Sequence, residues 1–188
     1  MDPGDALDVE FGPPPKKCIF SAKDLSEFKK SKAFQEIQIF IQQCAEAVHG
    51  CMISDVLPSD ISPAVESIEV YMIRLNKLID EIPPLSQPMR YGNKAFKQWY
   101  SRQVEETKLF LVDLIPIELA QKGALEELVP YLTCSYGDDT RIDYGTGHEM
   151  NLTIFFLCLY KVDLSLLLLL SLLFYFYYKS LPYFELYS

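Results

Sequence analysis

Histidine is the scarcest ionisable residue of this chain, and its scarcity limits the metal sites that can form. His49 and His148 are the only two. Zinc sites draw most of their ligands from His and Cys, and the five cysteines form no C-x-x-C pair. His148-Glu149 also lacks the second His, four residues on, that a zinc-protease helix requires. The sequence therefore predicts no zinc site, and we assign no metal-ligating residue.

Features of secreted and nucleic-acid-binding proteins are missing as well. The cysteine count is odd, whereas a small secreted framework normally pairs an even number. Residues 1–10 are acidic and lack the apolar run of a signal peptide. Seventeen basic residues face 26 acidic ones, for a net charge of −9, which argues against a nucleic-acid binder. We expect reduced thiols and a cytoplasmic protein that is present in the nucleus too.

The chain has the length and composition of one packed domain. It has 188 residues, of which 49% are hydrophobic and 13% aromatic, and a domain usually takes about 100–200 residues. Residues 1–19 contain the run Pro13-Pro14-Pro15 and little periodicity. We expect a disordered leader over residues 1–19, a helical domain over residues 20–163 and a divergent hydrophobic tail over residues 164–188.

Apolar residues recur at helical spacing along most of the domain, with no convincing strand alternation. Ser21 and Asp24 resemble a capping box ahead of a helix over residues 24–48 that ends at Gly50. Further helices are predicted from Pro63 to residue 79, from Asn93 to residue 111, over residues 117–132 with a bend at Pro130, and from about His148. The predicted fold class is all-α.

Residues 140–149, Thr-Arg-Ile-Asp-Tyr-Gly-Thr-Gly-His-Glu, are the most informative segment. Gly145 and Gly147 flank Thr146, and we expect them to take positive φ angles and to let the backbone approach a ligand. A helix starting near His148 would direct free N–H groups at the same loop. Arg141 adds a planar fork of donors suited to phosphate. The loop therefore reads as an anion or phosphate-ester site.

Two motifs carry a resemblance to a known family. Residues 140–149 resemble the signature of the phosphotyrosyl phosphatase activators, the activators of protein phosphatase 2A. Residues 87–100, Gln-Pro-Met-Arg-Tyr-Gly-Asn-Lys-Ala-Phe-Lys-Gln-Trp-Tyr, are similar to the family's QPxRFGNKAFRxWY segment. The resemblance covers residues 20–162. It implies a helical domain like the N-terminal portion of the activator fold.

The resemblance also implies a function and a ligand. Family members activate or assemble protein phosphatase 2A, so its catalytic and scaffold subunits are the expected partners, with ATP and magnesium as cofactors. The matching ATP positions are Arg141, Thr146 and Gly147. The family is described as having peptidyl-prolyl cis–trans isomerase activity on a proline-containing peptide. Isomerisation needs no nucleophile, so the catalytic residues are left unassigned.

Plainer interpretations stay open beside these. Arg141 could form a salt bridge within a structural turn, and Asp143 or Glu149 could cap a helix or pair with an Arg rather than bind magnesium. We expect Phe96 and Trp99 in the core, whereas Arg90 and Lys94 are equally suited to the surface and to a contact with the signature loop, residues 140–149. The whole chain could be a non-catalytic phosphatase-binding module, or a truncated isoform that lacks activity.

The last part of the chain departs from the family pattern. Residues 164–178 are uncharged and almost continuously apolar, and the family's downstream segment that supplies magnesium ligands has no counterpart. Fifteen residues are short of the roughly 20 that a membrane span needs. The tail could be a membrane anchor, a segment packed on the helices or an aggregation-prone terminus.

Overall fold

In the described part of the chain the helices follow one another without intervening strands. The structure is a computed structural model that describes residues 11–50, 52, 63–86 and 92–162. Within these residues the elements are α1 Ala22–Phe28, α2 Lys32–Val48, α3 Pro63–Glu81, α4 Ala95–Leu114, α5 Ile117–Ala120, α6 Ala124–Cys134 and α7 Thr146–Lys161. The all-α prediction is confirmed.

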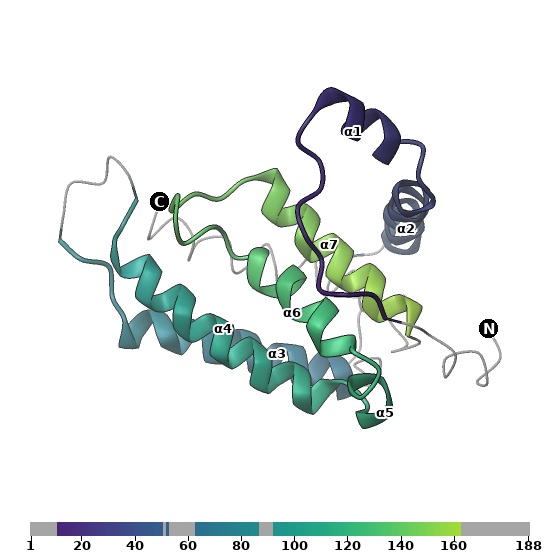
Figure 1. The fold of residues 1–188 in the computed structure, drawn as a ribbon. Helices are drawn as coiled ribbons and strands as arrows, with labels where there is room; N and C mark the ends of the chain where they lie inside the picture. The colour runs from purple at the N-terminus through teal and green to yellow at the C-terminus, as the bar shows by residue number, and fades with distance from the viewer. Residues whose placement is uncertain (1–10, 51, 53–62, 87–91, 163–188) are drawn as a thin grey trace.

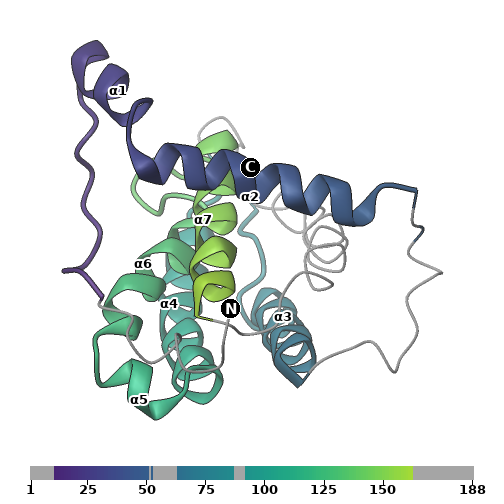
Figure 2. The ribbon, with the colours of Figure 1, turned by 90° about the vertical axis from the view of Figure 1, so that its right-hand side faces the viewer.

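The long helices pack in a chain of neighbours (Figure 1). Helices α3 and α4 pack side by side, α4 also contacts α6, and α6 lies against α7. Helix α2 crosses α7, in front of it in the view of Figure 2. The two helices are joined by an ion pair in which Lys161 Nζ lies 2.9 Å from Glu36 Oε2. Helix α1 stands apart and buries none of its residues. The fold therefore has α4, α6 and α7 at its centre.

The core is continuous through these helices. Leu78 of α3, Leu111 of α4, Leu128 of α6 and Leu159 of α7 are almost fully buried. A second, polar layer joins α3 to α4, where Tyr71 Oη lies 2.6 Å from Thr107 Oγ1 and Gln103 Nε2 donates to Thr107 Oγ1 at 2.8 Å. Burial raises the pKa of Tyr71 to about 12.

The first predicted helix is in fact two. Ser21 and Asp24 form the expected capping box at the start of α1. The chain then leaves the helix after Phe28, and Ser31 starts α2 by accepting the backbone N–H of Phe34 at 3.2 Å. The prediction of one helix over residues 24–48 was wrong because apolar spacing continues across this second cap.

The remaining boundaries also differ from the predictions in ways that proline and glycine explain. Helix α4 extends to Leu114, and Ile115 becomes extended because it precedes Pro116. Gly123, with φ +97°, separates α5 from α6, whereas Pro130 lies inside α6 without ending it. The helix predicted over residues 117–132 is therefore divided at Gly123, and Pro130 does not shorten it.

Asn93 does more than the predicted helix cap. Its side chain is buried; Oδ1 accepts the N–H groups of Leu85 and Ala95, each at 3.0 Å, and Nδ2 donates to the Leu85 carbonyl at 2.9 Å. The cap position itself is Lys94. Asn93 thus ties the segment after α3 to the start of α4.

Candidate functional site

The connection between α6 and α7 begins as a tight hairpin. Asp138 and Asp143 form an isolated bridge, in which Asp138 N–H donates to the Asp143 carbonyl at 3.2 Å and Ile142 N–H donates to the Asp138 carbonyl at 2.7 Å. Ile142 adopts a left-handed conformation with φ 53°. The hairpin fixes the chain that carries Arg141.

Asp138 closes this turn from within. Its Oδ1 accepts the N–H groups of Thr140 at 2.9 Å and Arg141 at 2.8 Å. The backbone N–H of Arg141 is the main reason that the pKa of Asp138 falls below its ordinary value, with Thr140 N–H and the Arg141 charge acting in the same direction. Asp138 is half-buried, and its carboxylate has a structural role in this turn.

The two sequence motifs meet at the hairpin. Gly92 has φ +75°, and a Cβ atom on it would lie 2.5 Å from Ile142 Cγ2. Gly137 has φ +114°, and a Cβ atom there would lie 2.9 Å from the Asp143 carbonyl oxygen and 3.2 Å from Phe96 Cζ. Residues 87–100 and 140–149 are far apart in the sequence. They approach each other closely because Gly92 and Gly137, which lie where the two segments meet, have no side chains.

Aromatic packing anchors the root of the hairpin on α3 and α4. The Tyr136 ring meets the rings of Trp99 and Tyr71 edge-on, at centroid distances of 6.1 and 6.4 Å. The Tyr136 hydroxyl donates to Met72 Sδ at 3.3 Å. Phe96 and Trp99 are buried, as predicted. Lys94 is exposed, and Arg90 lies outside the described residues.

The predicted ligand residues Arg141, Thr146 and Gly147 are all exposed. The Arg141 side chain is 60% exposed, and its Nε lies 3.0 Å from Asp143 Oδ2 and 3.8 Å from Asp138 Oδ2. The salt bridge that we had kept as an alternative is therefore present. It holds the guanidinium at the surface of the hairpin.

Thr146 and Gly147 form the first turn of α7, where backbone N–H groups lack helical partners. Gly145 caps this helix with no side-chain hydrogen bond. The prediction of positive φ at Gly145 and Gly147 was wrong, because Gly145 is extended with φ −176° and Gly147 is helical. Among the described residues, no atom beyond the chain neighbours and the backbone of α7 lies within 4 Å of a Cβ built on either residue. Neither the backbone conformation nor the packing of the described residues therefore requires glycine at position 145 or 147.

His148 is a part of the site that the sequence did not point to. Its Nδ1 lies 2.6 Å from the Cys134 carbonyl oxygen, and its ring stacks on Tyr144 with centroids 5.6 Å apart. Sequence inspection had weighed His148 only as a zinc ligand. The sequence signal available was the short connection between the end of α6 and the start of α7. This connection suggests a contact between the two helix ends only once the hairpin geometry is known.

The charges around the loop bear on the expected cofactors. Four acidic residues, Asp138, Asp139, Asp143 and Glu149, lie close to Arg141 in the sequence, and Lys17 adds a second positive charge near Asp138. No group of three or more His, Cys, Asp or Glu side chains in the described part of the chain is arranged to hold a metal ion. The described residues include hydrogen-bond donors suited to phosphate, namely the Arg141 guanidinium and the first N–H groups of α7. They include no group of protein ligands arranged around a magnesium ion.

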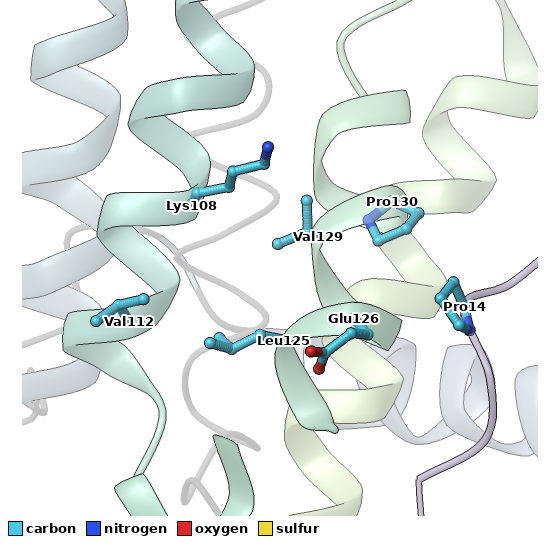
Figure 3. Close-up of a pocket in the computed structure, with 7 residues that line it drawn as sticks. All are labelled: Pro14, Lys108, Val112, Leu125, Glu126, Val129 and Pro130. Carbon is cyan, nitrogen blue, oxygen red and sulfur yellow. The ribbon is translucent and has the colours of Figure 1, made fainter. Parts of the chain in front are cut away.

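A separate apolar hollow of about 410 Å³ lies between α4 and α6 (Figure 3). Its lining consists of Pro14 from the leader, Lys108 and Val112 from α4, and Leu125, Glu126, Val129 and Pro130 from α6. None of these residues belongs to residues 140–149. The hollow and the loop are distinct features.

The predicted tail, residues 164–188, lies outside the described residues, so the structure tests none of its three interpretations. Across the ranges that the structure describes, no helix combines the length and apolar character needed to cross a membrane.

An all-helical domain with two converging motifs and an Arg-bearing hairpin at a helix start defines a phosphatase-activator-like class. The comparisons make the class definite: residues 15–178 match the family described as "Phosphotyrosyl phosphate activator (PTPA) protein". The chain belongs to this family, as the motifs indicated.

Relatives and a solved structure agree with this assignment. The chain is 36% identical to "Serine/threonine-protein phosphatase 2A activator" of Drosophila melanogaster, over 79% of this chain and 36% of the relative. It is 34% identical to "Probable serine/threonine-protein phosphatase 2A activator 2" of Dictyostelium discoideum, over 83% of this chain and 34% of the relative. The crystal structure of the PP2A phosphatase activator Ypa1 aligns with a TM-score of 0.81 and 29% identity, covering 96% of this chain and 58% of that one. The chain spans about a third of the length of these two relatives.

Proposed function

We propose that this protein activates or assembles protein phosphatase 2A by binding its catalytic and scaffold subunits, with Mg-ATP bound at residues 140–149. Support comes from the family membership and from relatives that are named phosphatase 2A activators. The observation that carries the nucleotide part is the open space around Gly145 and Gly147, which follow the exposed Arg141 closely in the chain. Two glycines that the described chain does not require are explained by the close approach of a ligand to the backbone.

The residues present suit the phosphate part of the nucleotide. The first N–H groups of α7 carry the positive end of the helix dipole, and Thr146 and Gly147 supply them. The Arg141 guanidinium can donate to phosphate oxygens once it shares or leaves Asp143. When bound, Mg-ATP would supply a compact cluster of anionic oxygens whose charge the metal partly neutralises. Magnesium commonly keeps several waters and phosphate ligands, so it does not require a group of three or more protein ligands, and none is found among the described residues.

Between enzyme and binding module, the described geometry favours the module. An isomerase must lower a barrier of about 18–20 kcal/mol by holding a twisted X-Pro bond, and a partly apolar pocket would serve this. The apolar hollow between α4 and α6 shares no residue with the loop. Isomerase activity therefore remains the secondary proposal, and phosphatase binding the primary one.

The test is reactivation of an inactive preparation of phosphatase 2A catalytic and scaffold subunits, followed with a phosphopeptide substrate. We expect this chain to raise the activity with Mg-ATP present, and Arg141→Ala to lose most of that effect. Arg102→Ala is the matched control, because Arg102 is a half-buried α4 residue paired with Glu81 and Glu105, away from residues 140–149 in the sequence. No reactivation by the unmodified chain, while a full-length relative works in parallel, would contradict the proposal.

A second assay separates the two classes. Isomerisation of a proline peptide is measured with the unmodified chain and with Arg141→Ala and Gly147→Ala. A binding module predicts no acceleration by any of them. Acceleration that both substitutions abolish would instead make the loop part of an isomerase site.

A further inference from the structure

His148 lies where three parts of the α6–α7 connection meet. Its Nδ1 is 2.6 Å from the Cys134 carbonyl oxygen at the end of α6. Its ring is nearly parallel to that of Tyr144, at 20° with centroids 5.6 Å apart. On its other side, Nε2 is 3.7 Å from Asp143 Oδ1. Only 12% of the side chain is exposed, so the ring is held in place by these contacts.

The contact with Cys134 fixes which nitrogen carries a proton. A carbonyl oxygen can only accept a hydrogen bond, so Nδ1 must be the donor. The last carbonyls of a helix have no partner within the helix, and Cys134 is the last residue of α6. His148 therefore caps the end of α6 from the first turn of α7.

A short path leads from this ring to Arg141. Tyr144, which stacks on His148, is the neighbour of Asp143 in the chain. The Asp143 carboxylate lies 3.0 Å from Arg141 Nε. An anchored ring thus restrains the backbone at residues 143–144, and that backbone carries the carboxylate that holds the guanidinium.

We propose that His148 is a positioning residue for Arg141: its Nδ1–H bond to Cys134 sets where the guanidinium lies relative to the start of α7. This inference rests on the proposed function in one respect only, namely that Arg141 contacts phosphate. His148 itself need not touch the ligand.

Two substitutions divide the contributions of the ring. His148→Asn keeps an N–H donor near the position of Nδ1 but removes the ring and Nε2. His148→Phe keeps a ring to stack on Tyr144 but removes the donor and leaves the Cys134 carbonyl without it. His49→Asn is the matched control, because His49 is the exposed residue that follows α2.

The first readout needs no ligand. The chain has only two histidines, so ring ¹⁵N spectra at about pH 8.5, well above the ordinary histidine pKa, give two sets of signals that His49→Asn assigns. We expect His148 as the Nδ1–H tautomer. The Arg141 Nε–H signal, assigned by its loss in Arg141→Lys, should move in His148→Phe and stay near its original position in His148→Asn. An Nε2–H tautomer in the unmodified chain, or an Arg141 signal that His148→Phe leaves unmoved, overturns the inference.

The second readout is Mg-ATP affinity, measured by titration calorimetry on the same proteins. Leaving a carbonyl without its donor typically costs enough to change an equilibrium about tenfold, so we expect His148→Phe to weaken binding by about that factor. His148→Asn should stay within about threefold of the unmodified chain. Equal losses in both variants overturn the inference. If the unmodified chain binds no Mg-ATP, the nucleotide part of the proposed function fails, and the Arg141 signal still decides the role of His148.

Discussion

Gly137 lies at the start of the connection between α6 and α7, and Gly147 lies in the first turn of α7 that follows this connection, yet their surroundings are opposite. Gly137 has φ +114°, and a Cβ there would lie 2.9 Å from the Asp143 carbonyl oxygen. Gly147 is helical, with no atom within 4 Å of an added Cβ. The first glycine is required by the fold of this chain, and the second is not. A motif glycine therefore points to a ligand only where the chain itself gives no reason for it.

The largest expected effect is the loss of stability in Gly137→Ala. The left-handed conformation costs about 1–2 kcal/mol for a residue with Cβ, and overpacking against Asp143 and Phe96 adds about 1–3 kcal/mol. We expect the free energy of unfolding to fall by about 2–4 kcal/mol in urea titrations. Gly123→Ala is the control, because Gly123 has φ +97° but an added Cβ would meet only ordinary contacts, at 3.7 Å from Phe11 Cβ and 3.9 Å from Glu126 Oε2, and it should lose only the conformational part. Equal losses at both positions would show that the close contact at Gly137 is immaterial.

Alkaline pH should weaken the anchor beneath the hairpin. Tyr71 packs against Tyr136, and burial raises its pKa to about 12, against about 10 in the unfolded chain. Its contribution to stability is complete below pH 10 and is lost as the pH rises towards 12, because the unfolded chain releases the proton first. The loss should total about 2–3 kcal/mol.

The measurement is urea unfolding of the unmodified chain and of Tyr71→Phe between pH 9 and pH 11. The other tyrosines affect both proteins alike, so the stability difference between them should shrink as the pH rises. A difference that stays constant would mean that Tyr71 ionises as it does in the unfolded chain.

A smaller effect is expected at Asp138. Asp138→Ala removes the acceptor for the N–H groups of Thr140 and Arg141, which should cost about 1–2 kcal/mol, and Asp138→Asn should cost less because it keeps an acceptor. The lowered pKa of Asp138 means that its contribution is present above its ordinary pKa of 3.8 and is lost as the pH falls through the lower folded value. Acid unfolding of the unmodified chain and Asp138→Asn should therefore converge below that ordinary value. Parallel acid curves would contradict this role.

The smallest change in stability, and one of opposite sign, belongs to Gly147→Ala. Alanine is favoured over glycine in a helix by about 0.5–1 kcal/mol, and the side chain meets no neighbour. A modest rise in the midpoint of urea unfolding is expected. A clear destabilisation would mean that Gly147 is as structural as Gly137, and the contrast between them would disappear.

Apolar spacing was sufficient to predict the fold class and most helices. It failed where local side-chain chemistry interrupts a helix without interrupting the spacing, as Ser31 does between α1 and α2. It also failed to separate α5 from α6. The left-handed Gly123 divides the predicted helix, whereas α6 continues through Pro130.

The candidate site was predictable as a list of residues but not as an arrangement. Arg141, Thr146 and Gly147 were identified through the family resemblance, and the structure places them at one exposed edge. The contacts of Gly92 with Ile142 and of His148 with Cys134 depend on how the hairpin folds back on α4 and α6. Such contacts between distant segments leave no periodic trace in a single sequence.

The most direct test of the central claim combines unfolding and Mg-ATP titration on Gly147→Ala. If the space at this glycine is kept for a nucleotide, the variant will be at least as stable as the unmodified chain, yet its affinity for Mg-ATP will fall about tenfold or more, a change of about 1.4 kcal/mol. An affinity equal to that of the unmodified chain in an equally stable variant would contradict the claim.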